Sequence, residues 1–291
     1  MARQAALCFL TLTFILCCNF KAISASQSCW DVPFRISAGW ILVKARIGGL
    51  DGLTFQIDTG STCSLIDRKI VRKLGLTPEP GEYRLNAYGQ IGNAKKVELS
   101  ALQMGRISTR LRCFEADLSM WSVDGLIGLD VLRHMNQIVN IDTGEAPARK
   151  TLTLDFGPRC LRFGESVKLD HAVPLEADPT QIVVAAEIQG HSLRLALDTG
   201  SRISVLYAGA QRDWIHGLPI IGYWEGSRLL GRYQQKEVRI QNFILGTTRC
   251  DDMSALVSDA QNHPIDGLLS VVQLGPKILH LDFDCNLMSW K

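Results

Sequence analysis

Asp58-Thr59-Gly60-Ser61 and Asp198-Thr199-Gly200-Ser201 are two copies of one tetrapeptide in a single chain, 140 positions apart. Each copy follows an apolar run, Leu53-Thr54-Phe55-Gln56-Ile57 or Leu193-Arg194-Leu195-Ala196-Leu197. An acidic residue that leaves a strand into a glycine-containing turn lies outside the strand ladder, so its side chain can face a shared cleft. A lone Asp-Thr-Gly is usually a plain turn, but the duplication with matched flanks predicts two carboxylates that work as a pair.

The remainder of the second half repeats the first half at a nearly constant offset. The matched segments, with offsets of 140 to 142, are 32–34 with 173–175, 41–47 with 182–188, 123–128 with 265–270, and 138–142 with 278–282. An offset that drifts by only two residues indicates a duplicated unit. The sequence therefore predicts two homologous lobes.

Short apolar segments separated by turn residues predict a mostly β fold with few short helices. The expected boundaries are a signal peptide at 1–26, an N-terminal lobe at 27–155, a linker at 156–172 and a C-terminal lobe at 173–291, with the active-site cleft between the lobes. Two short helices are expected, at 67–74 and 131–135.

A third Asp-Thr-Gly occurs at Asp142-Thr143-Gly144. Its counterpart in the second half is Asp282-Phe283-Asp284, which lacks the Thr-Gly pair. The mismatch assigns Asp142 to an ordinary turn and excludes it from the predicted pair.

The first 26 residues have the features of an export signal. Arg3 gives a positive start, the apolar stretch 5–18 follows, and small residues occupy much of 22–26. The apolar stretch is too short to span a bilayer, so the sequence predicts an exported protein, periplasmic or secreted, without a membrane span. Lipid anchoring at Cys17 or Cys18 is the less favoured alternative, because the small residue expected before a lipidated cysteine is missing.

Composition predicts a globular protein with a balanced charge. The 291 residues are 46% hydrophobic and 21% charged, which suits one large or two modest cores. Loss of Arg3 and Lys21 with the signal would lower Lys+Arg from 31 to 29, equal to the 29 Asp+Glu. Without a dense basic run, we expect no nucleic-acid partner.

Six cysteines would remain after signal removal, and export permits disulfides. Fifteen pairings of six cysteines are possible. The lobe layout suggests Cys63 with Cys113, Cys250 with Cys285 and Cys29 with Cys160, and six free thiols are the alternative. The absence of Cys-x-x-Cys and of His-Glu-x-x-His argues against a metal site.

With these features together, the chain resembles pepsin-like and retropepsin-like aspartic proteases. Each tetrapeptide is followed about 70 residues later by an apolar-apolar-small triplet, Leu126-Ile127-Gly128 or Leu268-Leu269-Ser270. The resemblance covers essentially the whole mature chain. Its small lobes are most similar to a fused pair of retropepsin-type subunits, as in compact microbial members.

The resemblance implies an aspartic endopeptidase that hydrolyses a peptide or protein substrate. Asp58 and Asp198 would share one proton and activate a water molecule, with no metal or other cofactor. Because both motifs lie in one chain, a monomer is expected to be active.

The resemblance also assigns roles to the other motif residues. Thr59 and Thr199 would bond across the lobe interface, and Gly60 and Gly200 would let the backbone approach the carboxylates closely. The hydroxyls of Ser61 and Ser201 would donate to the outer carboxylate oxygens. Since such donors favour the ionised form, an acidic pH optimum is expected.

A hairpin flap from the first lobe is expected over the cleft, within residues 85–93, with Tyr88 and Gly89 at its tip.

A function of a different class is the alternative, a catalytically silent module that binds peptides or a partner protein. Two departures from the family pattern favour it. Ser270 stands where the family has glycine, and the cation of Arg202 lies beside the second motif.

Overall fold

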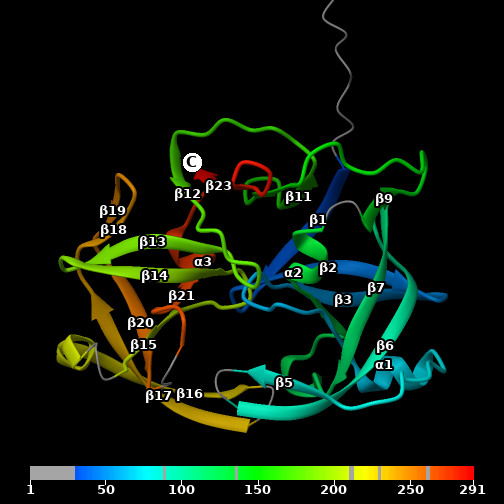
Figure 1. Cartoon of the computed structure of the whole chain (residues 1–291), viewed down its shortest axis with the longest axis horizontal. Coiled ribbons are helices and arrows are strands. Elements are labelled where there is room, and N and C mark those ends of the chain that lie inside the picture. Colours follow the sequence, from blue (N-terminus) through cyan, green and yellow to red (C-terminus); the bar gives the residue numbers. More distant parts are fainter. Residues whose placement is uncertain (1–29, 88–89, 135–136, 210–212, 229–230, 260–262) are drawn as a thin grey trace, which may run out of the picture.

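The computed structural model describes residues 30–291, apart from 88–89, 135–136, 210–212, 229–230 and 260–262. Over this part the chain is mostly β, with two sheets and short helices only (Figure 1). The predicted fold class is confirmed.

The larger sheet is built mainly from the first half of the chain. Its order is β12-β23-β22-β10-β11-β1-β2-β3-β8-β4-β7-β6-β5, and β9 pairs with β7. The strands of the first half are β1 (Trp30–Ser37), β2 (Trp40–Ile47), β3 (Leu50–Ile57), β4 (Leu65–Asp67), β5 (Tyr83–Ala87), β6 (Gln90–Met104), β7 (Ile107–Ala116), β8 (Gly125–Ile127), β9 (Ile138–Asn140), β10 (Thr151–Asp155) and β11 (Cys160–Phe163). The C-terminal part contributes β12 (His171–Pro174), β22 (Ile278–Asp282) and β23 (Leu287–Trp290).

The smaller sheet belongs wholly to the second half, in the order β16-β17-β20-β15-β21-β14-β13-β18-β19. Its strands are β13 (Val183–Ile188), β14 (His191–Asp198), β15 (Ser204–Tyr207), β16 (Ile220–Arg228), β17 (Gly231–Ile240), β18 (Phe243–Leu245), β19 (Thr248–Cys250), β20 (Met253–Ser258) and β21 (Gly267–Ser270).

The two halves share one strand topology around the motif-bearing strands. In the first half β3 runs parallel to β8, β4 parallel to β7, and β4 antiparallel to β8. In the second half β14, β21, β15 and β20 repeat these three pairings with the same directions. The repeat in the sequence therefore corresponds to a repeat in structure, and it places each Asp-Thr-Gly-Ser at the end of a central, buried strand.

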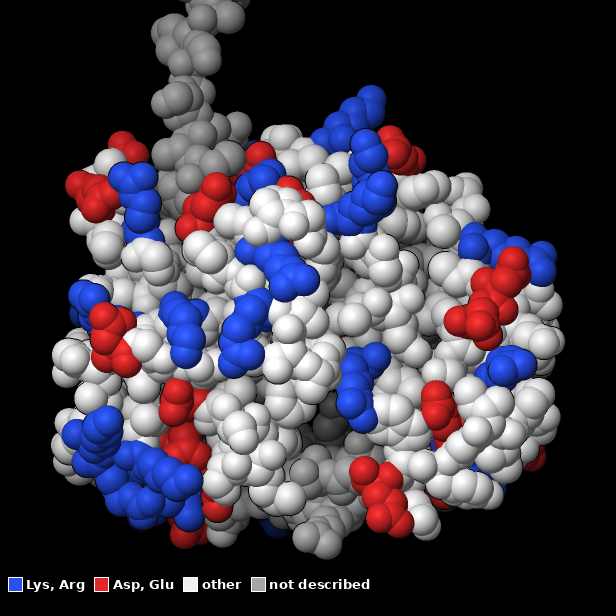
Figure 2. Space-filling model, turned by 180° about the vertical axis from the view of Figure 1, so that it is seen from behind, with Lys and Arg blue, Asp and Glu red and all other residues white. Residues whose placement is uncertain are grey.

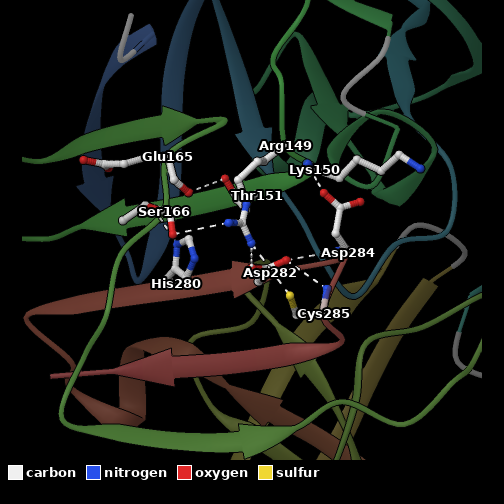
Figure 3. A network of polar contacts seen from close by, with 10 residues as sticks. Arg149, Lys150, Thr151, Glu165, Ser166, His280, Asp282, Asp284 and Cys285 are labelled. Carbon is white, nitrogen blue, oxygen red and sulfur yellow. Dashed lines mark hydrogen bonds and ion pairs between the residues drawn. The ribbon is translucent and has the colours of Figure 1, made fainter. Parts of the chain in front are cut away.

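The C-terminal strands are bonded to the first half by a network of polar contacts around β10 (Figure 3). Arg149 Nη2 donates to Asp282 Oδ2 over 2.6 Å, and the Lys150 N–H donates to Asp284 Oδ2 over 2.9 Å. Within β10, Thr153 Oγ1 lies 2.8 Å from Nδ1 of His280 in the neighbouring strand β22. The segment 156–172, expected as a linker, contains β11, whose Leu161 and Phe163 are buried between β1 and β10.

One pair of matched segments has diverged. Ile138–Asn140 forms β9 and pairs with β7, whereas the matched Ile278–Asp282 forms β22 and pairs with β10 and β23. The third Asp-Thr-Gly follows β9 in a turn, where Asp142 is half exposed and pairs with Arg106 at 2.6 Å. Its position agrees with the assignment of Asp142 to a turn.

The helices are short. The helix predicted at 67–74 is confirmed as α1 (Arg68–Lys73), for which the carboxylate of Asp67 accepts the Lys69 N–H at 2.7 Å as an N-cap. The second forms as α2 (Leu129–Leu132), beginning two residues earlier than expected, and Met135 lies outside the described residues. Further helical elements are α3 (Val271–Leu274) and the 3₁₀ turns η1 (Ser119–Trp121) and η3 (Asp213–Gly217).

The predicted disulfides do not form among the described residues. Cys63, Cys113, Cys160, Cys250 and Cys285 are free thiols, and Cys29 lies outside the described part. Cys113 packs into the largest core, whereas Cys63 packs against a smaller cluster. Cys250 and Cys285 belong to different sheets, and the Cys285 sulfur accepts from Arg149 Nη2 at 3.7 Å.

No helix in the described part of the chain is long and apolar enough to cross a membrane. Figure 2 shows Lys and Arg side chains interspersed with Asp and Glu over one face of the molecule, with no large area of one sign.

Candidate active site

The two motifs begin where β3 and β14 end. Asp58 directly follows β3, and its N–H donates to the Ile127 carbonyl of β8 over 3.0 Å. Asp198 is the last residue of β14, opposite Ser270 in the parallel ladder. Each acid is thus placed by a buried strand and by the apolar triplet that the sequence repeat had matched to it.

The structure brings the two carboxyl groups together, and each packs against the glycine of the other motif. A Cβ built on Gly60 would lie 2.6 Å from Asp198 Cγ, and one on Gly200 would lie 2.4 Å from Asp58 Cγ. The two carboxyl groups are close enough for each to affect the pKa of the other. Glycine is therefore required at both positions because any side chain would displace a carboxyl group.

The threonines of the two motifs exchange hydrogen bonds across the interface between the halves. The Thr59 N–H donates to Thr199 Oγ1 over 3.0 Å, and the Thr199 N–H donates to Thr59 Oγ1 over 3.1 Å. Each hydroxyl then donates to a carbonyl of the opposite strand, Thr59 to Leu197 and Thr199 to Ile57, both over 2.8 Å. This buried reciprocal set holds the two motif loops in one fixed relation.

Thr199→Val should destabilise the protein by about 2 to 4 kcal/mol, because it removes one hydroxyl and leaves the Thr59 N–H and the Ile57 carbonyl buried without a partner. Urea unfolding monitored by tryptophan fluorescence measures the change. Thr247→Val is the matched control, since Thr247 is exposed and should change stability by less than about 0.5 kcal/mol. Equal stabilities of the two variants would contradict the structural role of the threonine bonds.

Backbone N–H groups, and not serine hydroxyls, bond to the carboxylates. Gly60 and Ser61 donate their N–H groups to Asp58 Oδ1 over 2.9 and 3.2 Å, and Gly200 donates to Asp198 Oδ1 over 2.7 Å. The expectation for the serine hydroxyls was wrong. Ser61 Oγ donates to the Cys63 carbonyl over 2.7 Å and Ser201 Oγ to the Ile203 carbonyl over 2.6 Å, and a hydroxyl has only one proton to donate.

The environment of the pair raises the pKa of both carboxyl groups. Burial, followed by the neighbouring charge of Asp198, raises the pKa of Asp58 well above its ordinary value. Burial raises the pKa of Asp198 to about 6, against the opposing effect of the Gly200 N–H. Two adjacent carboxyl groups in this setting retain one proton over a pH range in which an exposed aspartate has lost its own.

Several supporting residues were not singled out from the sequence. Ser64 Oγ accepts the Gly128 N–H at 3.0 Å, and in the second half Ser204 Oγ accepts the Ser270 N–H at 3.1 Å. Both serines lie six residues after the motif aspartate, so the sequence repeat carried the signal. Gln56 had no such signal, because its matched residue is Ala196; its Nε2 donates across the interface to the Gly200 carbonyl over 3.0 Å.

Ser270 is accommodated by a rearranged contact. In the first half a Cβ on Gly128 would lie 2.7 Å from the Cys63 backbone, so that position requires glycine. In the second half Ser270 is fully buried, and its Oγ donates to the Ser201 carbonyl over 2.7 Å. The hydroxyl thus supports the second motif loop instead of disrupting it.

Two antiparallel hairpins belong to the same region of the repeat, one in each half. β5 pairs with β6 in the first half, and β16 pairs with β17 in the second. The flap candidates Tyr88 and Gly89 lie between β5 and β6, outside the described residues.

Within the described part of the chain, no group of His, Cys, Asp and Glu side chains could hold a metal ion.

Comparison with known families adds an independent observation to this geometry. Residues 43–131 match the family model for aspartyl proteases. The matched range runs from β2 to α2, so it contains the Asp58 motif and its triplet and ends before the second half. A comparison with curated proteins finds no match. The family match does not extend to the second half, whose likeness to the first half rests on the repeated strand topology and the contacts between the two motifs.

Proposed function

We propose that the protein is an exported aspartic endopeptidase that hydrolyses peptide bonds with water activated between Asp58 and Asp198. The observation that carries the proposal is the mutual packing of the two carboxyl groups on the opposite glycines, held by the threonine bonds. The family match over the first half supports the same class of enzyme.

In the proposed mechanism the pair carries one proton. The ionised carboxylate accepts a proton from the water molecule, which attacks the carbonyl carbon of the peptide bond. The protonated carboxyl group donates a hydrogen bond to the carbonyl oxygen, on which negative charge develops. The backbone N–H groups of Gly60 and Gly200 orient the two carboxyl groups throughout.

Incubation of the purified protein with a denatured protein substrate, with and without pepstatin, tests this proposal. We expect new peptide termini, detected by mass spectrometry, that disappear with the inhibitor. Absence of cleavage between pH 3 and 8 would instead support the catalytically silent binding module. The silent module was favoured because Ser270 replaces a glycine of the family pattern. That reason is weakened, because the Ser270 hydroxyl donates to the Ser201 carbonyl of the second motif loop.

The pH–rate profile should be bell-shaped. The rate should rise as pH increases through about 6, where one carboxyl group of the pair ionises, and should fall when the pair loses its remaining proton, whose pKa burial and the neighbouring charge also raise. The serine hydroxyls, from which an acidic optimum was expected, bond to backbone carbonyls instead of the carboxylates. An ascending limb at about pH 4, the usual range of a carboxyl group, would contradict the raised pKa values.

Export and monomeric activity are parts of the same proposal. Residues 1–26 carry the signal-like pattern, and both carboxyl groups come from one chain. N-terminal sequencing of the protein isolated from its natural source should find a chain that begins near residue 25 or 27. Specific activity that stays constant on dilution would support a monomer, and a fall would indicate association.

A further inference from the structure

Arg202 introduces a difference between two otherwise equivalent loops. It directly follows the second motif, and the residue at the same place in the first half is Thr62. Both side chains are exposed. The loop of the second motif therefore carries an exposed cation where the loop of the first motif carries a neutral hydroxyl.

The Arg202 side chain is held by contacts with both halves. Its Cζ lies 4.0 Å from the centroid of the Trp224 ring in β16, a cation–π geometry. Trp224 is itself fixed, because its Nε1 donates to Glu237 Oε2 over 2.6 Å and its ring packs on a buried cluster. On the other side, a Cβ on Gly39 in the β1–β2 turn would lie 2.3 Å from Arg202 Cβ, so the stem lies directly against the first half.

The guanidinium is held in place without an acidic partner among the described residues. Within that part of the chain it forms no ion pair, and no hydrogen bond from its N–H groups reaches another described residue. The nearby carboxylate of Glu237 is engaged by the Trp224 N–H. Stacking on tryptophan occupies the face of a guanidinium and leaves its N–H edge available for a carboxylate, which it can bind in a bidentate manner.

We propose that Arg202 is a specificity-determining residue that selects peptides carrying an aspartate or glutamate side chain at the subsite beside the second motif. This inference rests on the proposed peptidase function. Because the stem and the ring stack already restrain the side chain, little conformational freedom is lost when a carboxylate binds. The site is partly open to solvent, so we expect a moderate preference, about tenfold over the neutral isostere.

A set of matched peptides tests the proposal. One Glu or one Gln is moved through four positions on each side of a single cleaved bond, and kcat/KM is measured for every peptide. At one position the Glu peptide should be cleaved about tenfold more efficiently than the Gln peptide. Arg202→Thr, which installs the residue of the first half, should bring this ratio to about one through a higher KM for the Glu peptide, and Arg202→Lys should keep part of it. Arg110→Thr, at an exposed position of β7, is the control and should leave the ratio unchanged.

The inference can fail separately from the proposed function. Cleavage of both peptides with equal efficiency at every position, or a Glu preference that persists in Arg202→Thr, would overturn the role of Arg202 while leaving the peptidase function in place. If no peptide is cleaved, fluorescence anisotropy with the same labelled peptides measures binding. Tighter binding of one Glu peptide that is lost in Arg202→Thr would support the role of Arg202, and equal binding of Glu and Gln peptides would refute it.

Discussion

Asp58→Asn and Asp198→Asn should each lower the rate of peptide hydrolysis by about a thousandfold or more. An amide at either position can neither accept the proton from water nor keep a shared proton between the two groups, and general acid–base catalysis contributes factors of this size. Steady-state cleavage of a fluorogenic peptide at the pH optimum measures the loss. Each carboxyl group packs against the glycine of the other motif and affects the pKa of its partner, so the two variants should lose activity to a similar extent.

Asp142→Asn is the matched control for these two substitutions. Asp142 belongs to the third Asp-Thr-Gly, but it is half exposed and pairs with Arg106 on the surface. The control variant should retain the activity of the parent. Loss of activity in Asp142→Asn, or retained activity in Asp58→Asn, would refute the assignment of the catalytic pair.

Stability measurements on Asp198→Asn distinguish lost chemistry from a lost fold. Because the folded state raises the pKa of Asp198 to about 6, the folded state binds the proton more tightly than the unfolded state does. The stabilising contribution of that proton is complete below about pH 4 and is lost as pH rises through about 6. At pH 7 the free energy of unfolding of the variant should therefore equal that of the parent or exceed it by up to about 3 kcal/mol. The difference between the two proteins should be smaller at pH 4.

Gly200→Ala should lower kcat/KM at least about a hundredfold. The new Cβ would lie 2.4 Å from the Cγ and Oδ1 atoms of Asp58, well inside contact distance, so the carboxyl group or the loop must move. Asp58 is held by the N–H groups of Gly60 and Ser61, and a displacement of about 1 Å at a reacting group can cost a factor of this order.

Gly217→Ala provides the control for the glycine substitution. Nothing lies within 4 Å of a Cβ built on Gly217, and its backbone is not in the left-handed region. Activity and the free energy of unfolding should both stay close to those of the parent. If Gly200→Ala retains full activity, the carboxyl group of Asp58 does not need the position that the structure gives it.

Repetition within the chain made much of the architecture predictable. The matched segments around 41–47 and 182–188 became β2 and β13, and those around 123–128 and 265–270 became β8 and β21. Helix α1 was predictable because its cap, Asp67, and its stop, Gly75, act over one turn of chain. These features depend on neighbouring residues or on the similarity between a segment and its repeat. They can therefore be recognised without knowledge of the tertiary fold.

Contacts between distant segments were not predictable in the same way. The two cysteine pairings that lie within the described residues do not form: Cys113 and Cys63 pack in different clusters, and Cys250 lies in the smaller sheet, away from the β22–β23 turn that carries Cys285. The serine hydroxyls of the motifs donate to carbonyl groups two residues further along the chain, whereas backbone N–H groups donate to the carboxylates. The cross-interface bond of Gln56 is invisible in a repeat whose second copy has alanine.

The sequence by itself determined which two aspartates belong together, that a duplicated β unit carries them, and that Asp142 stands apart. Periodicity and matched spacing are properties of the chain, so they require no contact between the halves. Only the tertiary structure decided how the two acids meet, each against the opposite glycine and with a raised pKa, and how Arg202 is held between Trp224 and Gly39. Burial and the direction of a hydrogen bond depend on neighbours far away in sequence, and those neighbours exist only in the folded protein.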